Sequence, residues 1–297
     1  QKGDKMQEGK LALYYKKIEN SKVQCHLCPH NCIIKPDGVG VCRARKNING
    51  ELYSLNYGRV TSIALDPIEK KPLYRFYPGS MILSAGTFGC NLKCSFCQNW
   101  SIAHDNKASS YAVDVKPSEL VNKAVETRNR GNIGIAYTYN EPSVWFEYVY
   151  DTARLAKKEG LVNILVTNGF ISIEPLMDLL PFIDAVNIDV KAFTASFYSK
   201  ICGAVIENVK ETVEICAKNC HVEITTLVIP GLNDSLEEIE ELSKWLSSIS
   251  PEIPLHLSRF FPNYRMTDKP PTPVETLKKA RDKALKWMKY VYLGNVW

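Results

Sequence analysis

The chain has 297 residues, of which 45% are hydrophobic, and a formal net charge of +5. This length allows one large domain with a small appendage and disfavours two or three equal domains. No stretch of about 18 apolar residues is present, and the first twenty residues are too polar for a signal peptide, so we expect a soluble, cytoplasmic protein without a membrane partner. The basic residues are spread out and not gathered with aromatic ones, which argues against nucleic-acid binding.

The first motif is a cysteine-rich segment at residues 22–47. Its four cysteines have the spacing Cx2Cx3Cx9C and are Cys25, Cys28, Cys32 and Cys42. Clustered cysteines in a chain without an export signal favour metal over disulfides. Four thiolates saturate either a tetrahedral zinc ion or an iron-sulfur cubane, and His26 and His30 are alternative ligands. We therefore expect a second metal site here, zinc or iron-sulfur, that is structural or relays electrons.

Residues 48–80 predict a strand-rich connector. The segment NGELYSLNYGRVTSIAL has hairpin character, and DPIEKKPLYRFYPGS predicts an ordered loop. We accordingly divide the chain into residues 1–80, a cysteine-rich metal knot with its connector, and residues 81–297, a core domain.

The core domain is expected to be α/β. From residue 81, short β-branched runs alternate with segments of helical period, which is typical of parallel βα units. The predicted strands are MILSAG from 81, IGIAYTY from 133, VNILVTN from 162, IDAVNIDV from 183, HVEITTLVI from 221 and IPLHLSRF from 253. Six such units make a partial (β/α)6 barrel, because a complete eight-unit barrel needs roughly 250 residues. The chain stops just after another short strand, which leads us to expect a further tail.

The loop after the first core strand contains the most specific motif. Cys90, Cys94 and Cys97 obey CxxxCxxC, with the aromatic Phe96 before the last cysteine. Three thiolates on a four-iron cubane leave one iron free to bind another molecule. The alternative is a zinc knuckle, which normally needs a fourth ligand, and His104 is the nearby candidate. The loop leaves the carboxyl end of a barrel strand, where barrel active sites lie.

Polar residues also follow the next strands. Asn140 and Glu141 end the second strand and offer oxygens to an ammonium group, although an ordinary helix cap explains them too. Thr167 and Asn168 end the third. Alternation in NIDVK places Asn187, Asp189 and Lys191 on one face, where Asp189 and Lys191 either bind a charged ligand or form a structural ion pair. Three further cysteines are expected to be small buried side chains, namely Cys202, Cys216 and Cys220.

The cysteine loop resembles that of the radical S-adenosylmethionine (SAM) superfamily. The chain further resembles the AmmeMemoRadiSam-system radical SAM enzymes, which are similar to pyruvate formate-lyase activating enzymes. This resemblance extends over about residues 23–296 and rests on the motifs CHLCPHNC, GVGVCRAR, DPIEKKPLYRFYPG, CNLKCSFCQNW, YTYNEP, LVTNG, NIDVKAF, LVIPGLND, SRFFPNYRM and YVYLGNV. Unlike some activases with a ferredoxin-like insert after the SAM loop, this chain has its second cysteine group before the barrel.

The resemblance implies an oxidoreductase. A [4Fe-4S] cluster on Cys90, Cys94 and Cys97 would cleave SAM reductively to methionine and a 5'-deoxyadenosyl radical, under anaerobic conditions. Phe96 would lie beside the adenine, and Asp189 and Lys191 would position the SAM carboxylate and sulfonium. The radical would abstract hydrogen from a protein or peptide, an Ammecr- or Memo-type protein among the candidates, and a flavodoxin or ferredoxin would donate electrons. The alternative is a non-catalytic iron-sulfur or zinc module for electron transfer or assembly.

Overall fold

The computed structural model describes residues 9–105 and 107–296, and its centre is one mostly parallel sheet. The strand order is β16-β15-β14-β13-β12-β11-β9-β8. The strands are β8 Ser62–Pro67, β9 Met81–Gly86, β11 Asn132–Tyr137, β12 Val162–Thr167, β13 Ala185–Asp189, β14 His221–Val228, β15 Leu255–Arg259 and β16 Val291–Gly294. All six predicted core strands are present.

The sheet forms the predicted partial barrel. Strand β9 and strands β11 to β16 pair in parallel, and β8 adds to β9 in antiparallel orientation. Within the described residues, the two edge strands β8 and β16 form no ladder with each other, so the sheet stays open on that side. The parallel arrangement places the carboxyl ends of neighbouring strands at one rim, where the loops that carry polar motifs meet.

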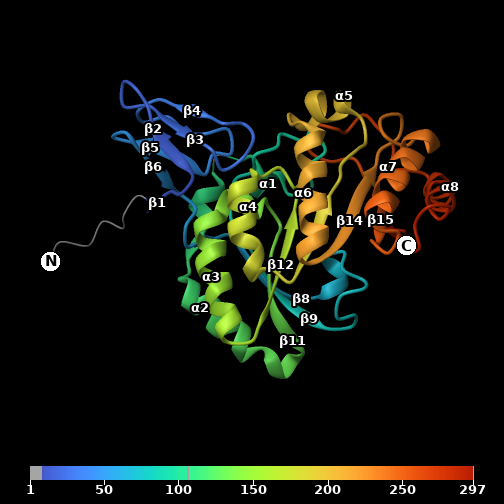
Figure 1. Cartoon of the computed structure of the whole chain (residues 1–297), viewed down its shortest axis with the longest axis horizontal. Helices are drawn as coiled ribbons and strands as arrows, with labels where there is room; N and C mark the ends of the chain where they lie inside the picture. Colours follow the sequence, from blue (N-terminus) through green and yellow to red (C-terminus); the bar gives the residue numbers. More distant parts are fainter. Residues whose placement is uncertain (1–8, 106, 297) are drawn as a thin grey trace.

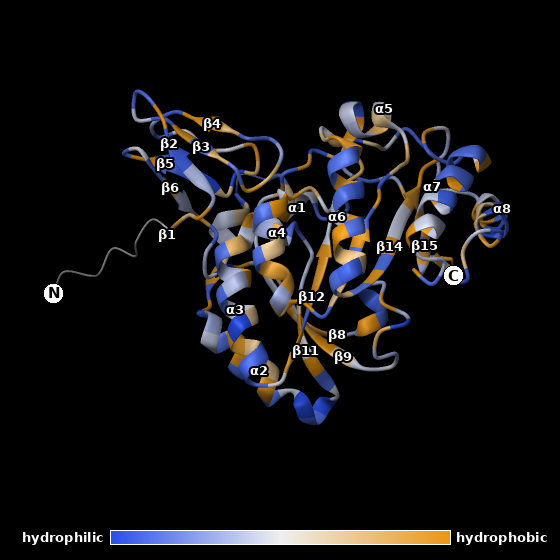
Figure 2. Cartoon of the chain, in the orientation of Figure 1, coloured by the Kyte–Doolittle hydropathy of each residue, from blue (hydrophilic) through white to orange (hydrophobic). Residues whose placement is uncertain are grey.

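Helices cover the outer face of the sheet (Figure 1). They are α1 Trp100–Ala103, α2 Pro117–Glu126, α3 Phe146–Lys158, α4 Ile173–Leu179, α5 Ala195–Phe197, α6 Ile206–Asn219, α7 Leu236–Ile249 and α8 Val274–Ala284. Their sequences mix polar and apolar residues, as expected for helices with one buried face (Figure 2). None of the helices within residues 9–105 and 107–296 is both long enough and apolar enough to cross a membrane.

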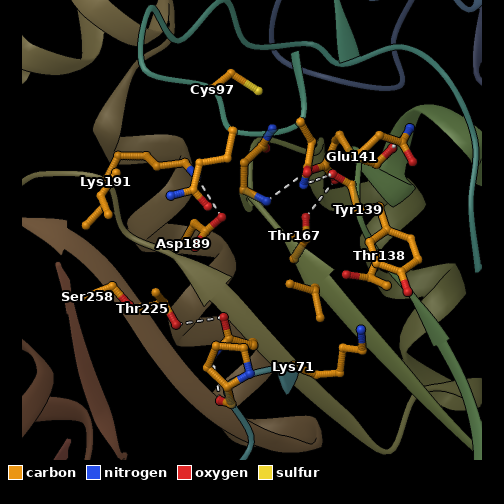
Figure 3. A pocket seen from close by; sticks show the side chains of 18 of the residues that line it. Lys71, Cys97, Thr138, Tyr139, Glu141, Thr167, Asp189, Lys191, Thr225 and Ser258 are labelled. Atoms are coloured by element: carbon orange, nitrogen blue, oxygen red, sulfur yellow. Dashed lines mark hydrogen bonds and ion pairs between the residues drawn. The ribbon is translucent and has the colours of Figure 1, made fainter. Parts of the chain in front are cut away.

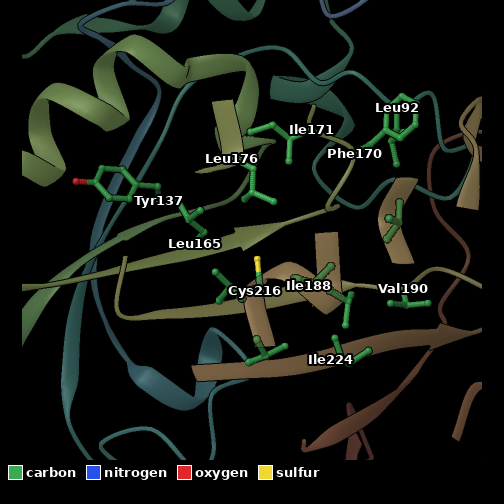
Figure 4. Close-up of a cluster of buried hydrophobic side chains, with 14 of the residues drawn as sticks. Leu92, Tyr137, Leu165, Phe170, Ile171, Leu176, Ile188, Val190, Cys216 and Ile224 are labelled. Atoms are coloured by element: carbon green, nitrogen blue, oxygen red, sulfur yellow. The ribbon is translucent and has the colours of Figure 1, made fainter. Parts of the chain in front are cut away.

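The hydrophobic core lies between the sheet and these helices. Ile188 on β13 and Ile224 on β14 are opposite each other in register, and both are fully buried. Figure 4 shows these residues close to Cys216 of α6. As predicted, Cys216 and Cys202 are buried, whereas Cys220 is partly exposed. Burial of this layer supplies the main driving force that holds the strand-end loops in place.

Small antiparallel sheets precede the barrel. The strands are β1 Lys10–Leu11, β2 Tyr15–Lys17, β3 Val23–Cys25, β4 Ile33–Ile34, β5 Arg45–Ile48, β6 Glu51–Ser54, β7 Arg59–Val60 and β10 Val113–Asp114. They form the sheets β1-β6-β5 and β2-β3-β4 and the pair β10-β7. We call residues 10–54, which contain β1 to β6, the N-terminal module. Strand β8 follows this module and belongs to the barrel sheet, while the boundary at residue 81 stays a prediction.

Candidate active site

A cavity of about 590 Å³ lies inside the rim of the barrel. All ten core residues predicted to bind cluster or cofactor line it, from four different loops: Cys90, Cys94, Phe96, Cys97, Asn140, Glu141, Thr167, Asn168, Asp189 and Lys191. Figure 3 shows Cys97 on one side of the cavity, with Asp189 and Lys191 from β13 facing Glu141 and Thr167 from β11 and β12. Its volume is within the usual range for small-molecule sites. The placement agrees with the sequence analysis, and the individual roles stay predictions.

Asn140 holds the start of the cysteine loop. Its side-chain oxygen accepts a hydrogen bond from the Thr87 amide (3.0 Å), and its side-chain nitrogen donates to the Gly89 carbonyl (2.9 Å). Both ends of the amide are therefore used on the two residues that flank Phe88, just before Cys90. This arrangement fixes the loop from which the first cysteine projects.

Glu141 connects the ends of β11 and β12. Its buried carboxylate accepts hydrogen bonds from the Thr167 hydroxyl (2.7 Å) and from the backbone amides of Asn168 (2.7 Å) and Ser143 (2.9 Å). Burial raises the pKa of Glu141 above its ordinary value, although the hydrogen bonds from Asn168 and Thr167 oppose that rise. The carboxylate thus orders two strand ends, and the oxygen that accepts from the Asn168 backbone amide still has a lone pair for a ligand cation.

Asp189 and Lys191 form an ion pair at the end of β13. The Lys191 Nζ lies 2.6 Å from the Asp189 carboxylate, and both residues are partly exposed to the cavity. Burial lowers the pKa of Lys191, but the charge of Asp189 outweighs it, so the pKa is raised overall and the ammonium persists at neutral pH. Alternation along NIDVK predicted this shared orientation.

The thiol pKa values of the three loop cysteines are all raised above the ordinary value. Burial raises the pKa of Cys97 to about 11, and burial with the charge of Glu141 raises that of Cys90. A hydrogen bond with Cys202, together with burial, raises the pKa of Cys94. Metal binding must therefore displace protons from the thiols. Three soft donors on one short loop, beside the Lys191 ammonium, fit an anionic iron-sulfur cluster with one open iron.

Sequence analysis missed the lower half of the cavity. It is lined by Lys71, Thr225, His256 and Ser258, among others. The Lys71 ammonium is buried and lies 2.8 Å from the Asp66 carboxylate. Polar residues at alternate positions, such as His256 and Ser258 on β15, were a usable signal, because they are typical of a strand that faces a polar interior.

A buried carboxylate fixes the floor of the cavity. Glu223 accepts hydrogen bonds from His256 (2.6 Å) and from the backbone amides of Tyr74 (3.0 Å) and Arg75 (2.7 Å). The Arg75 guanidinium in turn stacks 4.1 Å from the Tyr290 ring, next to β16. The segment around residue 74 therefore spans the gap between the two edge strands at this end of the barrel.

The four N-terminal cysteines lie outside this cavity, in and beside the small sheets of the N-terminal module. Burial raises the pKa of Cys25, that of Cys28 to about 12 and that of Cys42 to about 11. Among residues 9–105 and 107–296, no group of three or more Cys, His, Asp or Glu side chains is arranged to hold a single metal ion. The expectation of zinc at these cysteines therefore gains no support.

Residues 85–246 match the family described as the Radical SAM superfamily. The chain belongs to the radical SAM superfamily. It is 45% identical to "Uncharacterized protein MJ0808" of Methanocaldococcus jannaschii over 289 residues, which cover 96% of this chain and 85% of that protein. Membership makes the chain an enzyme of a family that uses an iron-sulfur cluster and SAM, and confirms the expected family.

Two further comparisons refine this result. The chain is 28% identical to pyruvate formate-lyase 1-activating enzyme of Escherichia coli strain K12 over 163 residues, 53% of this chain and 65% of that enzyme. This homology confirms the expected similarity to activating enzymes. The structure of Streptococcus suis SuiB bound to S-adenosylmethionine has a TM-score of 0.56 at 12% identity, and the match covers 72% of this chain and 51% of that chain. At this identity, the likeness shows the fold.

Proposed function

We propose that the protein binds a [4Fe-4S] cluster through Cys90, Cys94 and Cys97 and SAM in the adjoining cavity. The observation that carries this proposal is the convergence of the cysteine loop with the polar ends of β11, β12 and β13 on one cavity. When bound, the cluster would supply the electron that cleaves SAM to methionine and a 5'-deoxyadenosyl radical for hydrogen abstraction. This chemistry would make the protein an oxidoreductase.

The chain's own residues would bind and orient SAM in this cavity. The Lys191 ammonium, held by Asp189, offers a positive charge to the SAM carboxylate. Glu141 and the polar residues that it orders, Thr167 and Asn168, offer acceptors for the amino group. Phe96 is buried in the same cavity wall and provides an apolar surface for the adenine.

The substrate proposed here is a protein or peptide. Homology to an activating enzyme whose name specifies pyruvate formate-lyase supports a glycyl-radical-activase-like reaction. The motifs of the chain further support the AmmeMemoRadiSam subfamily, with an Ammecr- or Memo-type protein as a substrate and a flavodoxin or ferredoxin as the electron donor. A polypeptide segment would enter the cavity at the rim, where Gly294 and Asn295 at the end of β16 line it.

The N-terminal module would hold the second metal centre, at Cys25, Cys28, Cys32 and Cys42. Burial raises the pKa values of the Cys25 and Cys42 thiols, but the buried Arg45 guanidinium lies close enough to oppose that rise, which supports an anionic centre. Four thiolates around a cubane carry net negative charge, which this guanidinium would offset. The N-terminal module would then act as one unit beside the barrel.

Anaerobic SAM cleavage tests the proposed function. The anaerobically reconstituted full chain, reduced with dithionite, is expected to convert SAM to 5'-deoxyadenosine, detected by chromatography with mass spectrometry. Cys94→Ala should abolish the product, because a cluster ligand is lost. Cys220→Ala is the matched control and should retain it, since Cys220 lies after α6 and does not line the cavity. Absence of product from an iron-loaded wild type would favour the non-catalytic binding module.

A further inference from the structure

The N-terminal module packs directly against the cysteine loop of the barrel. A Cβ atom added at Gly89 would lie 2.6 Å from the Cys42 carbonyl oxygen, so the two backbones are in close contact next to Cys90. His30 Nε2 donates a hydrogen bond to the Asn91 carbonyl (2.7 Å), which directly follows Cys90. The acceptor is a carbonyl, so the ring nitrogen carries the proton. Two cysteine groups that are far apart in sequence thereby meet at one loop.

From Asn91 the contacts continue to a cysteine sulfur. The Asn91 side chain donates to the Phe170 carbonyl (2.6 Å) and accepts from Asn168 Nδ2 (2.9 Å). The same Asn168 nitrogen lies 3.7 Å from the Cys90 Sγ, within hydrogen-bond range for sulfur. Both asparagines are more than nine-tenths buried. Asn168 Nδ2 thus has one hydrogen for Asn91 and one for the sulfur.

His30 depends on the cysteines of its own module. It lies in the segment Cys28-Pro29-His30-Asn31-Cys32, and its backbone amide donates to the Cys28 sulfur. Its ring also packs edge-on against Phe170, with centroids 5.1 Å apart. A metal held by Cys28 and Cys32 would fix this short segment and, with it, the ring.

We propose that His30 and Asn168 are positioning residues for the cluster at Cys90. Through Asn91, His30 holds Asn168 so that its amide donates to the Cys90 sulfur, and this bond raises the reduction potential of the cluster. A donor to a cluster sulfur has this effect because the reduced cluster is more negative and gains more from the hydrogen bond. The inference rests on the proposed function, since it requires a cluster at Cys90, and it gives the N-terminal module a role in that site.

The test is an EPR-monitored redox titration of the anaerobically reconstituted full chain. The variants are Asn168→Ala, His30→Ala and His30→Gln, with His26→Ala as the matched control. His26 belongs to the same cysteine motif, but its ring bonds to Asn31 at the surface. The signal that is absent from Cys94→Ala identifies the cluster at Cys90, and iron content is measured for every variant.

Asn168→Ala is expected to lower the ratio of reduced to oxidised cluster at a fixed potential about tenfold, which corresponds to about 59 mV for a one-electron couple. His30→Ala should shift it in the same direction by roughly threefold, because it acts through the intervening asparagine. His30→Gln should restore the wild-type potential, since its amide places a donor near the position of Nε2. His26→Ala should leave the potential unchanged.

Equal potentials in the wild type and His30→Ala, at equal iron content, would overturn the inference. An equal shift in His26→Ala would do so too, because it would reduce the effect to general damage to the module. Failure of the proposed function has a different signature, in which no EPR signal of the wild type responds to SAM. The comparison of potentials among the variants is still measurable in that case.

Discussion

The contact between the N-terminal module and the barrel contains a buried ion pair whose disruption should be costly. The Arg45 guanidinium on β5 lies 2.6 Å from the Glu147 carboxylate on α3, and each side chain is only 1% exposed. The same carboxylate oxygen accepts from the Leu13 amide (2.8 Å), and Arg45 donates to the Leu13 carbonyl (2.9 Å). Glu147→Ala removes the charge and leaves the guanidinium buried without its partner.

The expected loss follows from this geometry. Breaking a fully buried pair by removing one partner costs about 3–5 kcal/mol of unfolding free energy. For a domain of this size, each kcal/mol lowers the melting temperature by about 2–4 °C, so a fall of about 6–20 °C is expected. The double variant Arg45→Met/Glu147→Leu removes both charges and should recover most of the loss, apart from about 1 kcal/mol for the orphaned Leu13 amide.

Urea unfolding monitored by circular dichroism, on identically reconstituted protein, measures these differences. Glu51→Ala is the matched control, because its ion pair with Lys17 is exposed, and it should change stability by less than about 1 kcal/mol. A Glu147→Ala loss as small as that of Glu51→Ala would refute the reasoning. A double variant less stable than the single one would also contradict it.

Three further predictions concern the cavity and its loops. Burial alone would raise the pKa of Glu223, but hydrogen bonds from two histidines and two backbone amides lower it to about 2. Its contribution of about 3 kcal/mol to the free energy of unfolding should thus be present at neutral pH and disappear as the pH falls from about 4.5 towards 2. Urea unfolding midpoints across this range should therefore fall less in Glu223→Gln than in the wild type. Gly89 has a φ of +94°, and a Cβ there would clash with the Cys42 carbonyl oxygen, so Gly89→Ala should reduce both stability and iron incorporation. Gly79 has a φ of +81° in open space, so Gly79→Ala should cost only about 1–2 kcal/mol of unfolding free energy, measured by thermal unfolding. Lys191→Met should weaken SAM binding about tenfold in equilibrium dialysis, while Met at the exposed Lys200 should have no effect.

Much of the barrel was predictable because its strands are β-branched runs with clear boundaries. The strand beginning at residue 81 and the CxxxCxxC loop after it locate the rim of the barrel from local sequence alone. The rule that parallel strands end at one rim then places Glu141 and Lys191 in the same cavity, as observed. The alternation of NIDVK was sufficient to orient Lys191 and Asp189 together.

Other features depend on contacts between distant segments. Strand β8 pairs with β9 in antiparallel orientation, although the sequence predicted it as part of a strand-rich connector outside the core domain. The Asn140 side chain forms hydrogen bonds with the backbone of Thr87 and Gly89, which lie more than fifty residues earlier in the chain. No local sequence pattern predicts such hydrogen bonds. The packing of the N-terminal module against the Cys90 loop is similarly a tertiary contact. Side-chain hydrogen bonds of this kind are set by the assembled fold and have no sequence period.

The most direct test of the central claim is EPR of the reduced, anaerobically reconstituted protein before and after addition of SAM, with iron, sulfide and zinc content measured on the same sample. The account predicts a [4Fe-4S] signal whose shape changes when SAM binds, and the loss of that signal in Cys94→Ala. About four irons per chain would correspond to the Cys90 cluster alone, and about eight to a second cluster at the N-terminal cysteines. A signal indifferent to SAM, or zinc with no iron, would contradict the account.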